Sequence, residues 1–196
     1  NVALLSHYNA GKTSLAESML FTSGAIKRLG SVDNGTSASD YDPSEIDHHM
    51  SINLSILSHE WKEIRLNLID TPGYADFIGE VKAALRVCDG AVLVVCAASG
   101  VEVGTEQMWN YTEESNLPRL IFINKMDRDN ANFLQTLEQI QTRLSTRCLP
   151  IQLPVGEQND FQGTVDLVTM KGYSNSTSQN LDLPSSLFEQ AKAYRE

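Results

Sequence analysis

The chain opens with VALLSHYNAGKTSLAESML at residues 2–20, and the fold class can be inferred from this stretch. Residues 2–6 are an apolar run that ends in small and polar residues, which predicts a strand followed by a loop. Between residues 13 and 23 the apolar side chains recur at helical spacing, which predicts a helix. A strand, a loop and a helix in this order are typical of the first unit of an α/β domain.

The same alternation of strand and helix recurs further along the chain. Apolar strands are predicted at 64–70, 91–96 and 119–124, and the helical patterns that follow them lie at about 77–85, 106–115 and 133–144. Near-continuous apolar strands are typical of a parallel sheet that is covered on both faces. We therefore predict an α/β fold with a mostly parallel sheet and helices on both faces.

Two segments interrupt this rhythm. Residues 24–51 are polar, rich in Gly, Ser, Asp and Asn, and show no sustained periodicity. A connection of this length within a compact domain is usually functional or disordered. The second segment begins near residue 149, with strand-like runs at 150–155 and 163–170, a loop at 174–180 and a final helix from about residue 185. We interpret this second segment as an insertion.

The residues GKT at 11–13 lie between the first strand and the first helix, where a phosphate-binding loop is expected. Backbone amides and the helix N-terminus attract phosphates there, Lys12 supplies a positive charge, and the Thr13 hydroxyl can bind Mg²⁺. The full motif has a glycine five residues before Gly11, where this chain has Ser6. A plain helix start would explain GKT alone, but its position between strand and helix favours phosphate binding.

Two further motifs close later strands. In DTPG at 70–73, Asp70 can hold Mg²⁺ through water and the Gly73 amide can meet a γ-phosphate. In NKMD at 124–127, the Asp127 carboxylate can accept the ring N–H and the exocyclic amine of guanine, an arrangement that adenine does not offer. A Pro-Gly turn and a helix N-cap would explain these motifs separately. Three motifs in order at strand ends predict a guanine-nucleotide site.

With these motifs in place, the chain resembles the nucleotide-binding domain of elongation factor G and its close paralogues. The likeness begins at NVAL (1–4), includes the three motifs, and extends to PIQLP (150–154) and VDL (165–167). It implies a P-loop NTPase fold over residues 1–148. It also implies that residues 149–196 begin an inserted α+β subdomain, and that the closing elements of the core and a fifth, guanine-contacting motif lie outside this chain.

The resemblance further implies Mg²⁺-dependent binding of GTP or GDP, with a first switch at about 24–51 and a second at about 70–80. The expected nucleotide-contacting residues are Ser6, His7, Tyr8, Asn9, Ala10, Gly11, Lys12, Thr13, Ser14, Asp70, Thr71, Pro72, Gly73, Tyr74, Asn124, Lys125, Met126 and Asp127. The expected metal ligands are Thr13, Asp70 and Ser51, the last standing where the family has threonine. The expected catalytic residues are Lys12, Gly73 and Tyr74.

Tyr74 stands where the family has a histidine that orients the attacking water. Because tyrosine is larger and normally neutral at pH 7, two functions stay open. One is a GTPase whose hydrolysis drives a conformational switch on the ribosome, and the other is a GTP/GDP-sensing module with little intrinsic hydrolysis. A P-loop ATPase or kinase, which Asp127 opposes, and an α/β domain without a ligand are the remaining alternatives.

The composition bears on partners and location. Asp and Glu outnumber Lys and Arg by 25 to 15, and no basic block appears, so we expect no direct nucleic-acid contact by this segment. The resemblance to elongation factor G implies that the ribosome is contacted mainly through domains outside the chain. The longest apolar run, residues 91–98, is far shorter than the roughly 20 residues that span a bilayer, so we expect a cytoplasmic protein without membrane contact.

Overall fold

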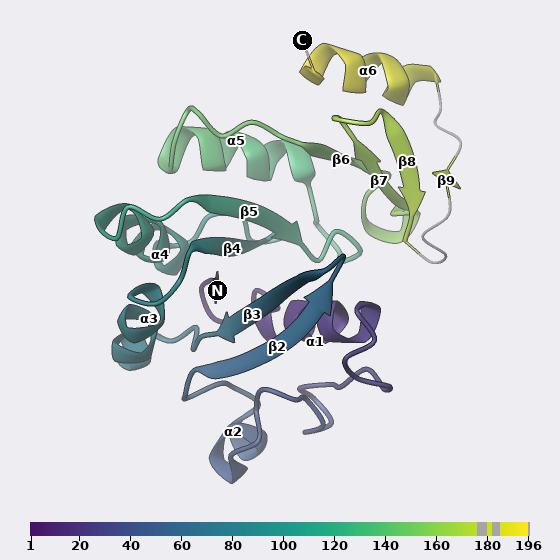
Figure 1. Ribbon diagram of the computed structural model, residues 1–196. Helices are drawn as coiled ribbons and strands as arrows, with labels where there is room; N and C mark the ends of the chain where they lie inside the picture. The colour runs from purple at the N-terminus through teal and green to yellow at the C-terminus, as the bar shows by residue number, and fades with distance from the viewer. Residues whose placement is uncertain (176–179, 182–184, 196) are drawn as a thin grey trace. The chain divides into compact units, whose positions relative to one another are not determined.

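The computed structural model describes residues 1–175, 180–181 and 185–195 (Figure 1). The contacts within the chain define two compact units. The first unit comprises Asn1–Val95 and Glu102–Asn124, and the second comprises Cys96–Val101 and Lys125–Glu196. Of the predicted loop at 174–180, residues 176–179 lie outside the described residues.

The first unit is built on a five-stranded sheet in the order β2-β3-β1-β4-β5. Its strands are β1 (Val2–Leu5), β2 (Ser55–Trp61), β3 (Ile64–Asp70), β4 (Gly90–Cys96) and β5 (Arg119–Asn124). Central strand β1 pairs in parallel with both β3 and β4, while β2 and β3 form an antiparallel hairpin. The carboxyl ends of β1 and β3 therefore meet at one edge of the sheet, which places the loops that follow them side by side.

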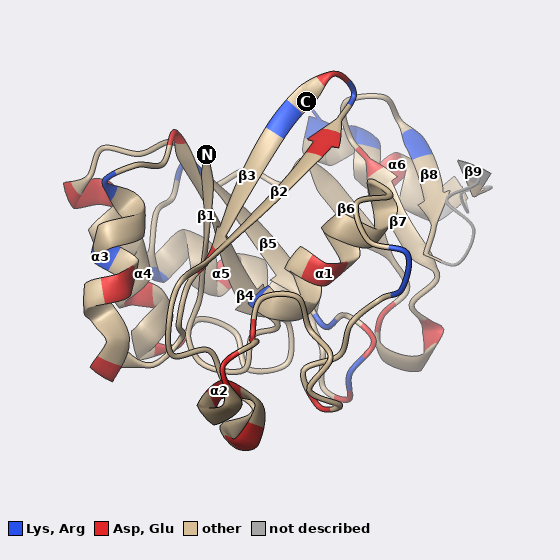
Figure 2. Ribbon diagram, turned by 60° about the horizontal axis from the view of Figure 1, so that its bottom comes forward, with Lys and Arg blue, Asp and Glu red and all other residues tan. Residues whose placement is uncertain are grey.

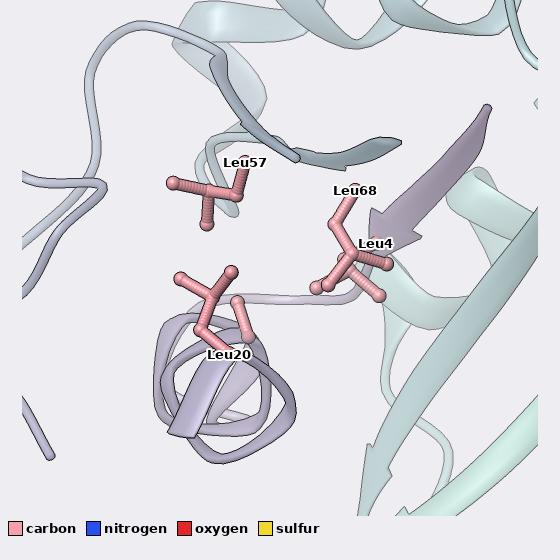
Figure 3. Close-up of a cluster of buried hydrophobic side chains, with 5 residues drawn as sticks. Leu4, Leu20, Leu57 and Leu68 are labelled. Atoms are coloured by element: carbon pink, nitrogen blue, oxygen red, sulfur yellow. The ribbon is translucent and has the colours of Figure 1, made fainter. Parts of the chain in front are cut away.

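Helices cover this sheet and build the core. They are α1 (Lys12–Thr22), α2 (Pro43–His48), the 3-10 helix η1 (Ala75–Phe77), α3 (Ile78–Leu85) and α4 (Val103–Glu114). Figure 3 shows one part of the core, where Leu20 of α1 lies against Leu4, Leu57 and Leu68 of the sheet. Ala3 and Leu5 alternate with Leu4 and are also completely buried, so both faces of β1 are covered. The α/β class with a mostly parallel sheet is thus confirmed.

Strand β2 was not predicted, because polar and apolar residues are mixed on both of its faces. Ile56 is exposed, whereas its neighbours Ser55 and Leu57 and the more distant His59 are buried. The hairpin turn at Lys62 and Glu63 has positive φ at both residues, 48° and 66°, as a tight type I′-like turn requires, but neither residue is the Asn or Gly that normally marks such a turn.

Helix α2 lies within the segment 24–51, for which the sequence showed no periodicity. Its N-terminus is a capping box: Asp42 accepts from the Ser44 amide, Glu45 accepts from the Asp42 amide, and Pro43 takes the first helical position. This Asp-Pro-Ser-Glu pattern was a readable helix-start signal. The helix is six residues long, which is too short for periodicity to reveal it.

The second unit contains an antiparallel sheet in the order β6-β7-β8-β9. The strands are β6 (Gln152–Val155), β7 (Gly163–Asp166), β8 (Lys171–Ser174) and β9 (Asn180–Leu181), and the helices are α5 (Phe133–Arg143), η2 (Gln158–Asp160) and α6 (Ser185–Arg195). Strand β7 is shorter than the predicted run at 163–170, because the Asp166 carboxylate accepts from the amides of Val168 and Thr169 and turns the chain. These hydrogen bonds lower the pKa of Asp166.

Among the residues that the structure describes, no helix has the length and apolar character needed to cross a membrane.

Candidate functional site

The loop between β1 and α1 has the geometry that phosphate binding requires. Gly11 precedes α1 in the left-handed region, at φ 92°, and as a glycine it supplies no side-chain cap to the helix. The first-turn amides of α1 are therefore left for another acceptor, with the positive end of the helix dipole behind them. Asn9 is also left-handed, at φ 60°, a conformation that asparagine tolerates better than most residues. The side-chain amide of Asn124, at the end of β5, donates to Ala10 O at 2.9 Å and fastens the loop.

Lys12 is buried beneath this loop, with 7 % of its surface exposed. Its ammonium donates to Ser6 Oγ at 2.8 Å, and the Ser6 hydroxyl in turn donates to His7 O. Burial lowers the pKa of Lys12, while the carboxylates of Asp70 and Asp40 act in the opposite direction. The serine that replaces the usual glycine at position 6 thus supplies a hydroxyl that holds the lysine.

The three predicted metal ligands lie together. Thr13 Oγ1 donates to Asp70 Oδ2 at 2.8 Å and lies 3.4 Å from Ser51 Oγ. Asp70 is 1 % exposed, and burial raises its pKa to about 6, although nearby Lys12 and the hydrogen bond from Thr13 oppose that rise. Asp70 Oδ1 is buried and has no hydrogen-bond partner among the described residues. A buried carboxylate oxygen left open beside two hydroxyls matches the all-oxygen ligands that Mg²⁺ prefers, so these residues fit the ion.

Asp40 belongs to the same group, although no sequence pattern pointed to it. Its Oδ1 accepts from Ser51 Oγ at 2.7 Å, and its Oδ2 is buried and unpartnered within the described part of the chain. Burial is the main cause that raises its pKa. Asp40 lies in the segment 24–51, where no periodicity distinguishes one aspartate from another, so only the folded structure brings it to this place.

The DTPG segment lies directly against the phosphate loop. Thr71 Oγ1 donates to Leu4 O at 2.7 Å, and Pro72 beside it is buried. A Cβ added to Gly73 would lie 2.9 Å from Lys12 Nζ and 3.1 Å from His7 O, so a larger residue would require the lysine and the loop backbone to shift.

Tyr74, the next residue, contacts the phosphate loop through its ring. The ring centroids of Tyr74 and Tyr8 are 4.3 Å apart and the planes are inclined by 35°. Burial and the neighbouring Tyr8 raise the pKa of Tyr74. A tyrosine hydroxyl is protonated at neutral pH at its ordinary pKa, and this shift favours the protonated form further.

His7 joins the phosphate loop to the start of α4. Its Nε2 lies 3.1 Å from Glu102 Oε1, and its Nδ1 lies 3.3 Å from Thr105 Oγ1. His7 is buried, so its side chain packs inside the domain and anchors the phosphate loop, whereas Tyr8 is exposed. Ser14, in the first turn of α1, is exposed as well.

The NKMD motif spans the two units. Asn124 ends β5 in the first unit, whereas residues 125–127 belong to the second. There Met126 is buried and its carbonyl accepts from the Gln158 amide at 2.7 Å, while Lys125 has a positive φ of 60°. Asp127 is exposed, so its carboxylate is open to a ligand.

The uncapped helix start, the buried lysine and the oxygen cluster at the ends of β1 and β3 define a P-loop nucleotide-binding domain. The chain belongs to the elongation factor Tu GTP-binding domain family, whose family model matches residues 1–192. Its translational GTP-binding character, predicted from the sequence, is thereby confirmed at the level of the family.

A solved structure has the same fold over nearly the whole of this chain. A crystal structure of a protein from Thermus thermophilus matches with a TM-score of 0.94 and 34 % sequence identity. The match covers 99 % of this chain and 29 % of that protein's chain. The chain therefore spans less than a third of the length of this relative.

Proposed function

We propose that this chain is the Mg²⁺-dependent GTP-binding domain of an elongation factor G-like translation factor, in which GTP hydrolysis to GDP and phosphate drives a conformational switch on the ribosome. The observation that carries the proposal is the convergence of Thr13, Ser51 and Asp70 beside the buried Lys12. Membership in a translational GTPase family supports the ribosome as the partner and the cytoplasm as the location.

Each residue has a distinct task in this proposal. Lys12 and the first-turn amides of α1 bind the phosphates, and the Gly73 amide senses the γ-phosphate. Thr13, Ser51 and Asp70 hold Mg²⁺, directly or through water, and Asp40 orients Ser51 through its hydrogen bond. When bound, Mg²⁺ neutralises charge that develops on the β- and γ-phosphate oxygens.

Guanine recognition belongs to Asn124 and the three residues that follow it. Asp127 accepts the two N–H groups on the Watson–Crick edge of guanine, while Lys125 and Met126 shape the loop that carries it. Selection against adenine follows because adenine would leave this carboxylate without its hydrogen bonds. A P-loop ATPase is the alternative that this residue opposes.

The domain boundary is also part of the proposal. Residues 1–148 would form the nucleotide-binding core, and residues 149–196 would begin an inserted subdomain. The antiparallel sheet of β6 to β9 supports a separate module there, because it differs from the mostly parallel sheet of the first unit.

A second candidate function is a GTP/GDP sensor that hydrolyses GTP slowly. The contact between Tyr8 and Tyr74 favours this sensor. A protonated phenol does not accept a proton from the attacking water, and a ring that is packed on another ring is less free to turn and position that water. Both candidates share the nucleotide site and differ only in the rate of the chemical step.

The metal side of the site can be tested with Thr13→Ala. Loss of one oxygen ligand is expected to weaken Mg²⁺-dependent GTP binding by about tenfold, which corresponds to about 1.4 kcal/mol. The measurement is the GTP dissociation constant across a MgCl₂ titration. Thr13→Ser, which keeps the hydroxyl, should retain most of the affinity, whereas an unchanged titration in Thr13→Ala would contradict the assignment.

A further inference from the structure

Glu17 is a buried carboxylate that the nucleotide chemistry does not use. It lies in α1, four residues after Thr13, and only 1 % of its surface is exposed. Burial of a carboxylate is costly unless hydrogen bonds replace its water. Here Oε2 accepts from the Gly30 amide at 2.9 Å, and Oε1 accepts from the Ala38 amide. Both oxygens of Glu17 therefore hold backbone of the segment 24–51.

The two amides lie at the ends of a short loop, residues 30–38. Inside this loop the Thr36 amide donates to Ser31 O at 2.9 Å, and the Gly35 amide donates to Val32 O at 2.9 Å. Gly30 must be a glycine, because an added Cβ would collide with the Glu17 carboxylate and with Thr36 O. The loop is thus closed on itself and tied at both ends to α1 by one side chain.

The loop held by Glu17 is connected to the proposed metal ligands. Two residues after Ala38, Asp40 accepts from Ser51, and Ser51 Oγ lies 3.4 Å from Thr13 Oγ1. Thr13 and Glu17 are successive positions on one face of α1. Glu17, Ala38, Asp40, Ser51 and Thr13 therefore form a closed path that begins and ends on the same helix.

Glu45 holds the C-terminal part of the segment 24–51 in place. It is 2 % exposed, and its Oε1 accepts from the amides of Ile52 and Asn53 at 2.9 Å each. These bonds fasten the chain directly after Ser51 to helix α2. Figure 2 shows acidic positions, in red, on both α1 and α2. Glu45 ties the segment to itself, whereas Glu17 ties it to the helix that carries Thr13.

We infer that Glu17 is a positioning residue that sets Asp40 and Ser51 against Thr13, and so determines how strongly Mg²⁺ assists GTP binding. This inference rests on the proposed function. A carboxylate suits the task because both of its oxygens accept charge-assisted hydrogen bonds from amides. A glutamine would keep one acceptor and would turn an NH₂ group toward an N–H donor, which breaks one of the two ties.

The test compares native protein, Glu17→Gln and Glu17→Ala by GTP and GDP binding across a MgCl₂ titration and in EDTA. We expect Glu17→Gln to weaken GTP binding in Mg²⁺ by about five- to tenfold, because one charge-assisted hydrogen bond is lost. GDP binding in EDTA should change by less than about twofold, since it needs neither Ser51 nor the metal. Glu17→Ala should show the larger loss of the two. An exposed matched control, Glu114→Gln in α4, should leave both titrations unchanged.

A general loss of folding would lower GDP binding in EDTA as much as GTP binding in Mg²⁺, and that result would overturn the inference. Gly30→Ala provides a second variant, since it crowds the Glu17 carboxylate and the Thr36 carbonyl without changing any charge. It should weaken GTP binding in Mg²⁺ while GDP binding in EDTA changes little. Native-like titrations in both Glu17→Gln and Gly30→Ala would also overturn the inference. Absence of Mg²⁺-dependent GTP binding in the native protein would instead refute the proposed function.

Discussion

Asp127→Asn is expected to weaken GTP binding by on the order of 100-fold and to improve binding of xanthosine triphosphate. In the proposed guanine site this carboxylate would accept two N–H groups of the base, and each charge-assisted hydrogen bond contributes about 1.5–3 kcal/mol. Asparagine offers one acceptor and one donor, which complements the second carbonyl that xanthine carries in place of the amine. The measurement is competition by unlabelled GTP, xanthosine triphosphate and ATP against labelled GDP.

Asp129→Asn is the matched control, because it removes an exposed carboxylate two residues away. It should leave the order of the three nucleotides unchanged. If Asp127→Asn binds GTP as tightly as the native protein does, other residues recognise the guanine base and the assignment of the NKMD motif is wrong.

Tyr74→His is expected to accelerate single-turnover phosphate release from GTP by about 100-fold, the lower end of general acid–base effects. A tyrosine phenol is protonated at neutral pH at its ordinary pKa of about 10. Burial and Tyr8 raise the pKa of Tyr74 further, and its ring is packed against Tyr8. An imidazole offers a nitrogen that can accept a hydrogen bond from the attacking water. Phosphate release should be followed with and without ribosomes.

Tyr74→Phe separates the hydroxyl from the ring. It keeps an aromatic contact with Tyr8, so we expect a release rate close to the native one. A much slower rate in Tyr74→Phe would show that the tyrosine hydroxyl itself positions the water. Rapid release by the native protein that slows in Tyr74→His would favour an efficient GTPase over the slow sensor.

The parallel core could be predicted from the sequence because its strands are short, nearly continuous apolar runs that are each followed by a helical pattern. Strands β3 and β5 have the predicted bounds, β1 and β4 differ from their predicted bounds by one residue at one end, and α1 is shifted by one residue at both ends. The strands that were not predicted are determined by tertiary packing and not by a local sequence pattern. Strand β2 buries Ser55 and His59 while Ile56 faces solvent, and β8 and β9 are short, so no clear alternation marks them.

The candidate site likewise contains residues that the sequence predicts and residues that only the structure reveals. Lys12, Thr13 and Asp70 are predicted by motifs because each stands at the end of a strand or the start of a helix, and Ser51 was reached only through the family resemblance. Asp40 and Glu17 could not be predicted, because their role depends on which backbone amides and hydroxyls the folded segment 24–51 brings to them. The use of Ser6 as a partner of the lysine was likewise visible only in the structure.

Equilibrium binding of labelled GTP to the native protein, in MgCl₂ and in EDTA, is the decisive test of a Mg²⁺-dependent guanine-nucleotide site. We expect saturable binding that weakens when Mg²⁺ is removed and that unlabelled GTP and GDP abolish, while ATP at the same concentration leaves it intact. Displacement by ATP as effective as that by GTP, or saturation by neither GTP nor GDP, would contradict this assignment.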